Sequence, residues 1–353
     1  MSWWSDGSDD DEPEFDETQV RVRANPKGNR PRTKIRPEHS AAVLGMVTAV
    51  DRGRFTVLLD DDVVVTASRA RELGRKSIVT GDRVALVGDT TGVDGSLARV
   101  VRIEERSTLL RRSADDTDTV ERVIVANADQ MLIVVAAANP EPRLRLVDRY
   151  LVAAYDARLT PILCITKTDL ADPSEFLSHF AGLDLIVVTS RSDDPPLAEI
   201  GELLVGHVTV AVGHSGVGKS TLVNALVPDA HRAVGRVNDV TGRGRHTSSS
   251  SICLRYSVPA GSGSGSGWII DTPGVRSFGL GHIDTDHLVD AFGDLALIAE
   301  ECPRGCTHLP TAPDCAMVEA VASGRLDDKG ALRLDSLQRL LTTLVDKRDT
   351  REG

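Results

Sequence analysis

The sequence predicts a multidomain α/β protein that begins with a small OB-type β-barrel and ends in a mostly helical segment. Short β-rich runs separated by turn residues fill the stretch from about 43 to 103. Apolar strands then alternate with amphipathic helices, which is the pattern of a parallel sheet covered by helices. The 353 residues fit about two or three domains at ~150 residues each.

The composition of the chain excludes several classes of protein. The chain carries 41 Lys and Arg against 52 Asp and Glu, which gives a net charge of −11. Its longest apolar stretch, Met131–Ala138, is far shorter than the ~20 residues of a membrane span. Its N-terminus, rich in Trp and acidic residues, is unlike a secretory signal or a transit peptide. Five cysteines, an odd number, argue against a disulfide scaffold. We therefore expect a cytoplasmic protein, a monomer by default, and exclude secreted, membrane and fibrous proteins.

Residues 1–40 are predicted to be a disordered, charged tail. An acidic block without a basic residue is followed by a basic block without an acid, from Arg21 to Arg36. Such blocks bury too little apolar surface to fold. The tail is either a solvated extension or an arm that contacts RNA phosphates.

Residues 41–105 are predicted to form the OB-type barrel, a common platform for nucleic acid. The strands are expected at Val43–Val50, Arg54–Leu59, Val63–Thr66, Arg83–Gly88 and Ala98–Ile103. Phe55 is the only aromatic residue in these strands, so the barrel would bind an RNA backbone through Arg and Lys rather than by stacking.

Residues 106–282 are predicted to form a parallel α/β sheet. Met131–Ala138 is continuously apolar, as expected of a strand covered on both faces. Further strands are expected at Pro161–Thr166, Leu185–Thr189, Val208–Gly213, Ile252–Tyr256 and Trp268–Asp271, and helices near Val147–Ala154, Ser174–Phe180 and Leu197–Leu204. The Ser-Gly repeat from Gly261 to Gly267 is expected to be a flexible hairpin loop.

A phosphate-binding loop follows the strand Val208–Val212. The segment Gly213-His-Ser-Gly-Val-Gly-Lys-Ser220 matches G-x-x-x-x-G-K-S and precedes a helical pattern. Its glycines let backbone N–H groups cradle phosphate oxygens at a helix N-terminus. Lys219 is expected to neutralise the β- and γ-phosphates, and the Ser220 hydroxyl to bind Mg²⁺. The predicted nucleotide contacts here are Gly213, His214, Ser215, Gly216, Val217, Gly218, Lys219, Ser220 and Thr221. The alternative is a degenerate loop that binds nothing.

A second element, Trp268-Ile-Ile-Asp-Thr-Pro-Gly274, is a hydrophobic strand that ends in a carboxylate. This places Asp271 beside the metal ion and the Gly274 amide near the γ-phosphate. Alone the D-x-x-G pattern is weak, but at a strand end after a phosphate-binding loop it becomes specific.

Base choice is predicted at Thr166-Lys-Thr-Asp169, which resembles the guanine-reading N-K-x-D element of GTPases with Thr in place of Asn. A carboxylate at Asp169 accepts hydrogen bonds from guanine N1–H and N2–H₂, and the Lys167 stem packs on the ring. Adenine lacks these two donors, so the pairing discriminates strongly. Thr189 and Ser190 fit the second base loop.

The order of these motifs is unusual. The base-reading Asp169 precedes Gly213 by 44 residues, whereas in ordinary GTPases the phosphate-binding loop comes first. The order predicts a circularly permuted P-loop GTPase domain. Such rewiring can leave the sheet intact, because the termini of compact domains often lie close together.

Residues 283–353 are predicted to be a helical zinc-binding domain. Cys302, Cys306, His308 and Cys315 lie within fourteen residues, and three thiolates with one imidazole make a closed tetrahedral Zn²⁺ site. The alternative is a fortuitous cluster of reduced thiols. Cys164 and Cys253 lie in apolar runs and are expected to be core residues.

These features together resemble the ribosome-small-subunit-dependent GTPase family known as RsgA or YjeQ, over about residues 41 to 345. The resemblance implies GTP hydrolysis to GDP, stimulated by the small (30S) ribosomal subunit and its 16S rRNA during late maturation of the subunit. It also implies that Gly242-Arg-Gly-Arg-His-Thr247 is the switch I signature, with Thr247 a Mg²⁺ ligand beside Ser220 and Asp271. The zinc spacing C-x₃-C-x-H-x₆-C departs from the usual C-x₄-C-x-H-x₅-C of the family.

The group that orients the attacking water is a separate question. Val275 stands where many GTPases carry Gln, and a valine cannot hydrogen-bond water, so slow hydrolysis is expected of the isolated protein. His246 is the candidate, and the alternative is that it contacts rRNA or only shapes its loop.

Two other functions remain open from the residues. One is a P-loop phosphotransferase acting on a small molecule, which Lys167 and Asp169 disfavour. The other is a nucleotide-sensing RNA-binding module with negligible turnover. RNA contact would rest on local basic patches, since the chain is acidic overall. A basic run, which is either such a patch or a solvated strand edge, comprises Arg99, Arg102, Arg106, Arg111 and Arg112.

Overall fold

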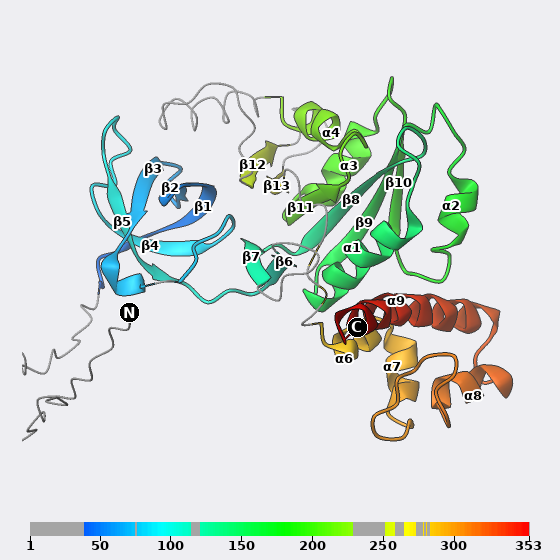
Figure 1. Ribbon diagram of the computed structural model, residues 1–353. Coiled ribbons are helices and arrows are strands. Elements are labelled where there is room, and N and C mark those ends of the chain that lie inside the picture. The colour runs from blue at the N-terminus through cyan, green and yellow to red at the C-terminus, as the bar shows by residue number, and fades with distance from the viewer. Residues whose placement is uncertain are drawn as a thin grey trace, which may run out of the picture. The chain divides into compact units, whose positions relative to one another are not determined.

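The computed structural model describes residues 39–74, 76–113, 121–228, 251–257, 265–272, 278, 280 and 283–352 (Figure 1). Nearly all of the charged tail predicted at 1–40 lies outside these residues, as does most of the Ser-Gly segment.

The first folded element is the predicted five-stranded barrel. Its strands are β1 (Val43–Asp51), β2 (Arg54–Leu59), β3 (Val64–Arg69), β4 (Arg83–Gly88) and β5 (Ala98–Ile103), with a 3₁₀ turn at Arg71–Leu73. They pair in the order β1-β2-β3-β5-β4, and β4 pairs back with β1 to close the barrel. Alternate residues point inward, so Val47, Val57 and Val100 are fully buried in its core. Phe55 belongs to this core, and no other aromatic side chain lies in the strands.

The central sheet carries the candidate site. Its strands are β8 (Gln130–Ala136), β9 (Thr160–Thr166), β10 (Ile186–Ser190), β11 (Val208–Gly213), β12 (Ile252–Ser257) and β13 (Ser266–Asp271). They run in the order β10-β9-β8-β11-β13-β12, all parallel except the edge strand β12. All seven residues of β8 are buried, as predicted for a doubly covered strand.

Helices cover both faces of this sheet, as Figure 1 shows. They are α1 (Leu144–Asp156), α2 (Ser174–Ser178), α3 (Leu197–Leu204) and α4 (Lys219–Leu226). Residues of α1 join one hydrophobic cluster with Ile133, whereas α3 and α4 join a second with Leu132. Cys253 and Cys164 are buried in the first and second clusters respectively, which confirms them as core residues.

A short hairpin not predicted from the sequence precedes the sheet. Its strands, β6 (Leu109–Ser113) and β7 (Glu121–Ala126), pair antiparallel as a separate two-stranded sheet. Leu110 and Val125 lie opposite each other and are buried in the same cluster as α1. Arg111 and Arg112, both half-buried, occupy successive positions of β6 and interrupt the apolar alternation in the sequence.

The barrel and the central sheet are continuous. β1 pairs antiparallel with β12 at Ala49 and Ile252, so the described strands other than β6 and β7 form one eleven-stranded sheet. Arg255 on β12 also donates a hydrogen bond of 2.8 Å to Asp62 in the turn between β2 and β3.

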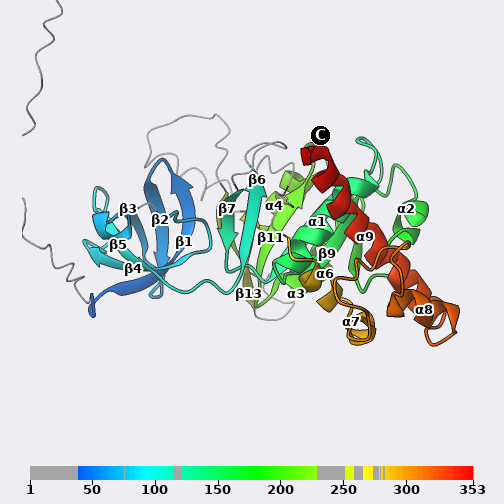
Figure 2. The same ribbon diagram turned by 60° about the horizontal axis from the view of Figure 1, so that its bottom comes forward.

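The C-terminal part is helical, as predicted. It comprises α6 (Thr285–Asp290), α7 (Gly293–Ala299), α8 (Ala316–Ala322) and α9 (Asp328–Glu352). In both views α9 lies beside α1 (Figures 1 and 2), and it also contacts α6 and α8. Leu337 and Leu340 of α9 are fully buried. No helix within the described part of the chain is long and apolar enough to cross a membrane.

Candidate functional site

The predicted phosphate-binding loop connects β11 to α4 at the carboxyl end of the sheet. Gly216 and Gly218 have φ angles of 84° and 91°, a region that side-chain-bearing residues rarely adopt. At Gly213 a Cβ atom would lie 2.6 Å from the carbonyl oxygen of Val134, because the loop passes close to β8. The glycines are therefore required for this path of the backbone, and α4 begins directly after it at Lys219.

Lys219, at the start of α4, meets Asp271, at the end of β13. Ala211 of β11 pairs with Asp271 of β13, and the Lys219 ammonium forms an ion pair with the Asp271 carboxylate. The buried Thr272 hydroxyl donates a hydrogen bond of 2.8 Å to the carbonyl of Ala211, which ties the end of β13 to β11. A carboxylate at Asp271 and a hydroxyl at Ser220, at the start of α4, are oxygen donors of the kind that Mg²⁺ prefers.

The predicted base-reading segment contacts the predicted phosphate-binding loop directly. The buried Thr166 hydroxyl lies 2.5 Å from the carbonyl oxygen of Val217 and 3.2 Å from that of Val135. Lys167, at a φ of 58°, donates from Nζ to the carbonyl of Gly216 at 2.8 Å and to that of Asn139. Thr166 therefore braces the two loops where an Asn would be expected to do so.

Asp169 is exposed, and a backbone hydrogen bond fixes its carboxylate. Its Oδ1 accepts a hydrogen bond of 2.8 Å from the backbone N–H of Ser192, in the segment after β10. That bond lowers the pKa of Asp169 below its ordinary value, so the carboxylate stays ionised as a hydrogen-bond acceptor. Ser190 pairs with Thr166 across the sheet and is buried, whereas Thr189 is exposed. The two predicted base loops thus lie on adjacent strands, β9 and β10.

Several predicted residues cannot be placed. His246, Thr247 and Gly274 lie outside the described residues, as does Val275.

The predicted zinc ligands form a compact cluster. One possible ligand atom from each of Cys302, Cys306, His308 and Cys315 lies within 4.8 Å of the others. The Cys302 and Cys315 sulfurs are 4.0 Å apart, and the His308 Nδ1 lies 3.6 Å from the first and 3.8 Å from the second. Tetrahedral ligands around Zn²⁺ lie about 3.5–3.8 Å apart at its usual bond lengths, so these three atoms lie close to the spacing that the ion requires, and three thiolates with one imidazole are ligands that Zn²⁺ takes.

Local backbone structure brings the four predicted ligands together despite the altered spacing. Gly305 and His308 have φ angles of 78° and 54°, which turn the chain sharply between the ligands. Burial lowers the pKa of His308, which favours the neutral imidazole that binds a metal. Gln338 of α9 donates a hydrogen bond of 3.1 Å to the carbonyl of His308. The loop that carries the predicted ligands, residues 302–315 (the knuckle), is therefore attached to this long helix.

Two site residues were not predicted from the sequence. Asn139 and Ser192 contribute only backbone atoms, the carbonyl that receives Lys167 and the N–H that binds Asp169. A backbone contact is independent of residue type and leaves no pattern in a single sequence. The basic run is also only partly available, because Arg106 pairs with Asp82 and Arg102 with Glu104.

Comparison with known proteins agrees with this geometry. A sequence model described as RsgA GTPase matches residues 103–281. A protein of Pseudomonas aeruginosa strain LESB58, named small ribosomal subunit biogenesis GTPase RsgA, is 34% identical over 282 residues, covering 76% of this chain and 77% of its own length. A protein of the same name from Chlorobaculum parvum is 33% identical over 314 residues, 85% of this chain and 97% of its own.

Solved structures show the same fold. The crystal structure of YloQ, described as a circularly permuted GTPase, has a TM-score of 0.60 at 26% identity and covers 88% of this chain and 97% of its own. YjeQ from Thermotoga maritima has a TM-score of 0.61 at 24% identity, with coverage of 86% and 99%. Given the family match, these relatives and the base-reading segment braced on a phosphate-binding loop that follows it in the chain, the chain belongs to the RsgA GTPase family.

Proposed function

We propose that this chain hydrolyses GTP to GDP and phosphate and acts on the small (30S) ribosomal subunit during its late maturation. One observation carries the GTPase assignment: the segment with Lys167 and Asp169, early in the chain, is hydrogen-bonded to the phosphate-binding loop through Thr166 and Lys167. These contacts support the assignment of a guanine-selecting carboxylate and a triphosphate cradle to one site. The ribosomal role is supported by the names of the relatives.

The residues divide the work of binding and hydrolysis. Backbone N–H groups of Gly213–Thr221 and the Lys219 ammonium would hold the phosphates, while Lys167, Asp169, Thr189 and Ser190 would hold guanine. Ser220, Thr247 and Asp271 would hold Mg²⁺, which supplies charge neutralisation at the β- and γ-phosphates when bound. The Gly274 N–H would contact the γ-phosphate. These assignments rest on the motif matches together with the described loop contacts.

His246 is proposed to orient the attacking water, because Val275 cannot. We expect His246→Ala to lower subunit-stimulated turnover while GTP binding remains nearly unchanged. Equal stimulated turnover by variant and parent would remove this assignment and favour a contact with rRNA or a shaping role.

The cysteine cluster is proposed to hold one structural Zn²⁺ per chain through Cys302, Cys306, His308 and Cys315. Four protein ligands leave no open position on a tetrahedral ion, so the site would stabilise the knuckle and take no part in the chemistry.

The partner would be the small subunit through its 16S rRNA, and we propose that the protein acts as a cytoplasmic monomer. Exposed Arg99 on β5 and the half-buried Arg111 and Arg112 on β6 could provide phosphate contacts without a basic overall charge.

Multiple-turnover phosphate release with and without purified small subunits tests the proposal. We expect slow release alone and faster release with subunits. An RNA-binding module with negligible turnover would release almost no phosphate in either case, and a phosphotransferase would depend on an added small acceptor. ADP should fail to displace a fluorescent GDP analogue, whereas GDP should displace it.

The variant Asp169→Asn tests whether Asp169 selects the base. The asparagine amide offers one acceptor and one donor, which matches the N1–H and O2 of xanthine rather than the two donors of guanine. We expect subunit-stimulated turnover of GTP to be lost and turnover of XTP to appear. Undiminished turnover of GTP by this variant would contradict the placement of guanine at Asp169.

A further inference from the structure

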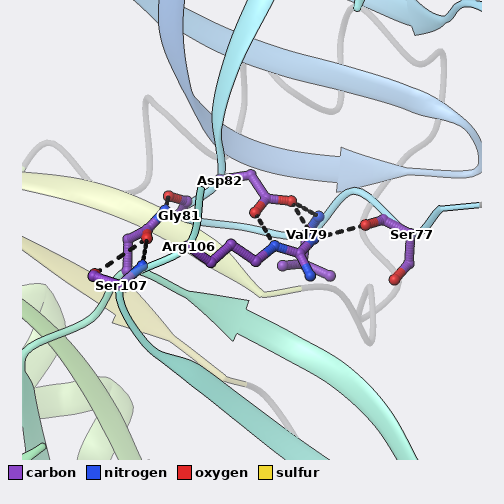
Figure 3. A network of polar contacts seen from close by, with 7 residues as sticks. Ser77, Val79, Gly81, Asp82, Arg106 and Ser107 are labelled. Carbon is purple, nitrogen blue, oxygen red and sulfur yellow. Dashed lines mark hydrogen bonds and ion pairs between the residues drawn. The ribbon is translucent and has the colours of Figure 1, made fainter. Parts of the chain in front are cut away.

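A loop of the barrel, residues 76–82 before β4, is fixed rigidly against the start of the GTPase domain (Figure 3). The fully buried carboxylate of Asp82 accepts two hydrogen bonds from the Arg106 guanidinium, at 2.6 and 2.8 Å, and a third from the Val79 N–H at 2.8 Å. Arg106 also donates to the carbonyl of Ser77 at 2.7 Å. A buried charge with this many partners has little freedom to move.

The same loop is held from the side of the hairpin. Asn127 donates from Nδ2 to the carbonyl of Gly81 at 2.9 Å, and its Oδ1 accepts from the backbone N–H of Ser107 at 2.9 Å. Gly81 has a φ of 89°, and a Cβ atom there would lie 2.0 Å from the carbonyl oxygen of Ala126. The loop is therefore in close contact with β7, and the Ala126 N–H donates to the carbonyl of Thr80 at 3.1 Å.

Thr80 at the centre of this loop reaches the candidate catalytic sheet. Its side chain is 2% exposed, and its hydroxyl donates a hydrogen bond of 3.0 Å to the carbonyl of Ser251, the residue before β12. The next residue, Ile252, pairs with Ala49 of the barrel on one side and with Asp271 of β13 on the other. Asp271 in turn pairs with Lys219.

We propose that Thr80 is a positioning residue for the Mg²⁺ carboxylate Asp271, so that the barrel forms part of the framework of the GTPase site. The inference rests on the proposed function, because it concerns the metal side of that same site. Thr80 acts through Ser251 and Ile252 and touches neither nucleotide nor metal.

The topology explains why this bond matters. β12 is the edge strand of the GTPase sheet, and among the described residues its backbone pairs with the barrel only at Ala49 and Ile252. Arg255, three residues further along β12, is hydrogen-bonded to Asp62 of the barrel, and the Thr80 hydrogen bond holds the residue directly before Ile252. Without the Thr80 hydrogen bond, the Ile252 end of β12 is held by its pairing with Ala49 of the barrel and by its pairing with Asp271 of β13.

The test compares Thr80→Val with Thr80→Ser and Thr48→Val. Valine has nearly the shape of threonine without the hydroxyl donor, and serine keeps the donor. Thr48 donates to the carbonyl of Thr56 within the barrel, so Thr48→Val removes a similar bond that does not reach β12. For each protein, the release rate of a fluorescent GDP analogue is measured across a Mg²⁺ titration, and hydrogen exchange is measured for peptides covering 252–257 and 266–271.

We expect Thr80→Val to need about threefold to tenfold more Mg²⁺ for half-maximal retention of the nucleotide, the effect of one lost hydrogen bond. Its exchange should rise in both strands, while the nucleotide release rate without Mg²⁺ is unchanged. Thr80→Ser and Thr48→Val should behave as the parent does. If Thr80→Val does not fold, Thr80→Ala carries the same expectation.

Two results would overturn the inference. In one, Thr80→Val and the parent show the same Mg²⁺ dependence. In the other, Thr80→Ser is impaired as strongly as Thr80→Val, which would indicate a merely structural role. If the parent itself retained guanine nucleotide no better with Mg²⁺ than without, the proposed function would fail instead.

Discussion

Thr166 shows how a departure from a motif can keep its physical role. Its hydroxyl reaches the carbonyl of Val217 in the phosphate-binding loop from a buried position, so one short side chain links the base-reading strand to the cradle. We expect Thr166→Val to weaken GDP binding about threefold to tenfold, because one buried hydrogen bond between the loops is lost. Equilibrium titration with a fluorescent GDP analogue measures this. Thr166→Ser, which keeps the donor, should bind GDP as the parent does. Equal weakening of GDP binding by both variants would show that the packing of the Thr166 side chain, rather than its hydrogen bond, determines the affinity.

Asp148 provides a second residue-scale prediction, on stability. Burial raises its pKa from the ordinary 3.8 to about 6, partly offset by Arg339 of α9, whose Nη2 lies 3.2 Å from Oδ1. The folded chain then binds this proton more tightly than the unfolded chain does, so the contribution of Asp148 to stability falls as pH rises from about 4 to about 6. The full shift corresponds to about 3 kcal/mol.

Asp148→Asn removes this titration. We expect the difference in unfolding free energy, parent minus variant, to fall by up to about 3 kcal/mol between pH 4 and pH 7, as measured by denaturant unfolding. Any constant offset from the lost ion pair cancels in this comparison. Parallel pH profiles for the two proteins would contradict the assignment.

At the scale of elements, the loop between α7 and α8 is expected to depend on a metal ion held by the cysteine cluster. Cys315 directly precedes α8, and Gln338 of α9 is hydrogen-bonded to the carbonyl of His308 in this loop. We expect one Zn²⁺ per chain by elemental analysis. Cys306→Ala should lose the metal and lower the Tm by at least about 4 °C, since a loss of about 2 kcal/mol lowers the Tm of a unit of roughly 150–250 residues by about 4–8 °C and that of a smaller unit by more. Cys164→Ala, at a buried thiol outside the cluster, should keep full zinc content. Equal zinc in both variants would contradict the ligand set.

The elements differ in how far the sequence determines them. Strands such as Arg54–Leu59 and Val208–Gly213 have the predicted bounds, because apolar alternation and turn residues mark both ends. The β6–β7 hairpin was missed, since Arg111 and Arg112 interrupt its alternation and its buried Leu110 pairs with a strand beyond a long connection. Arg106 was grouped with possible RNA contacts, yet it neutralises Asp82, a buried partner 24 residues earlier that local patterning cannot reveal.

At the scale of the whole molecule, the order of the motifs could be read from the sequence, whereas the pairing of distant strands could not. The permutation was predictable because each motif identifies its own place in a GTPase sheet, whatever the order. The junction of barrel and sheet was not, because the pairing of Ala49 with Ile252 joins residues 203 positions apart that carry no special signal. The barrel's buried loop at Thr80–Asp82 looks like an ordinary turn in sequence, and only the fold shows that it reaches β12.

The last prediction concerns the proposed binding of this acidic chain to a ribosomal subunit. With a net charge of −11, any attraction to RNA must come from local basic residues, among which Arg99 is exposed on β5. Each phosphate contact releases counterions, so the logarithm of the binding constant should fall steeply and linearly with the logarithm of salt concentration. Arg99→Ala should weaken binding and reduce that slope by about one unit. Arg325→Ala, which removes an exposed arginine already paired with Glu301, should change neither quantity. Sedimentation of the protein with purified subunits over a range of KCl concentrations measures both quantities. A salt-independent affinity of the parent would show that shape and apolar contacts, rather than phosphates, hold the complex together.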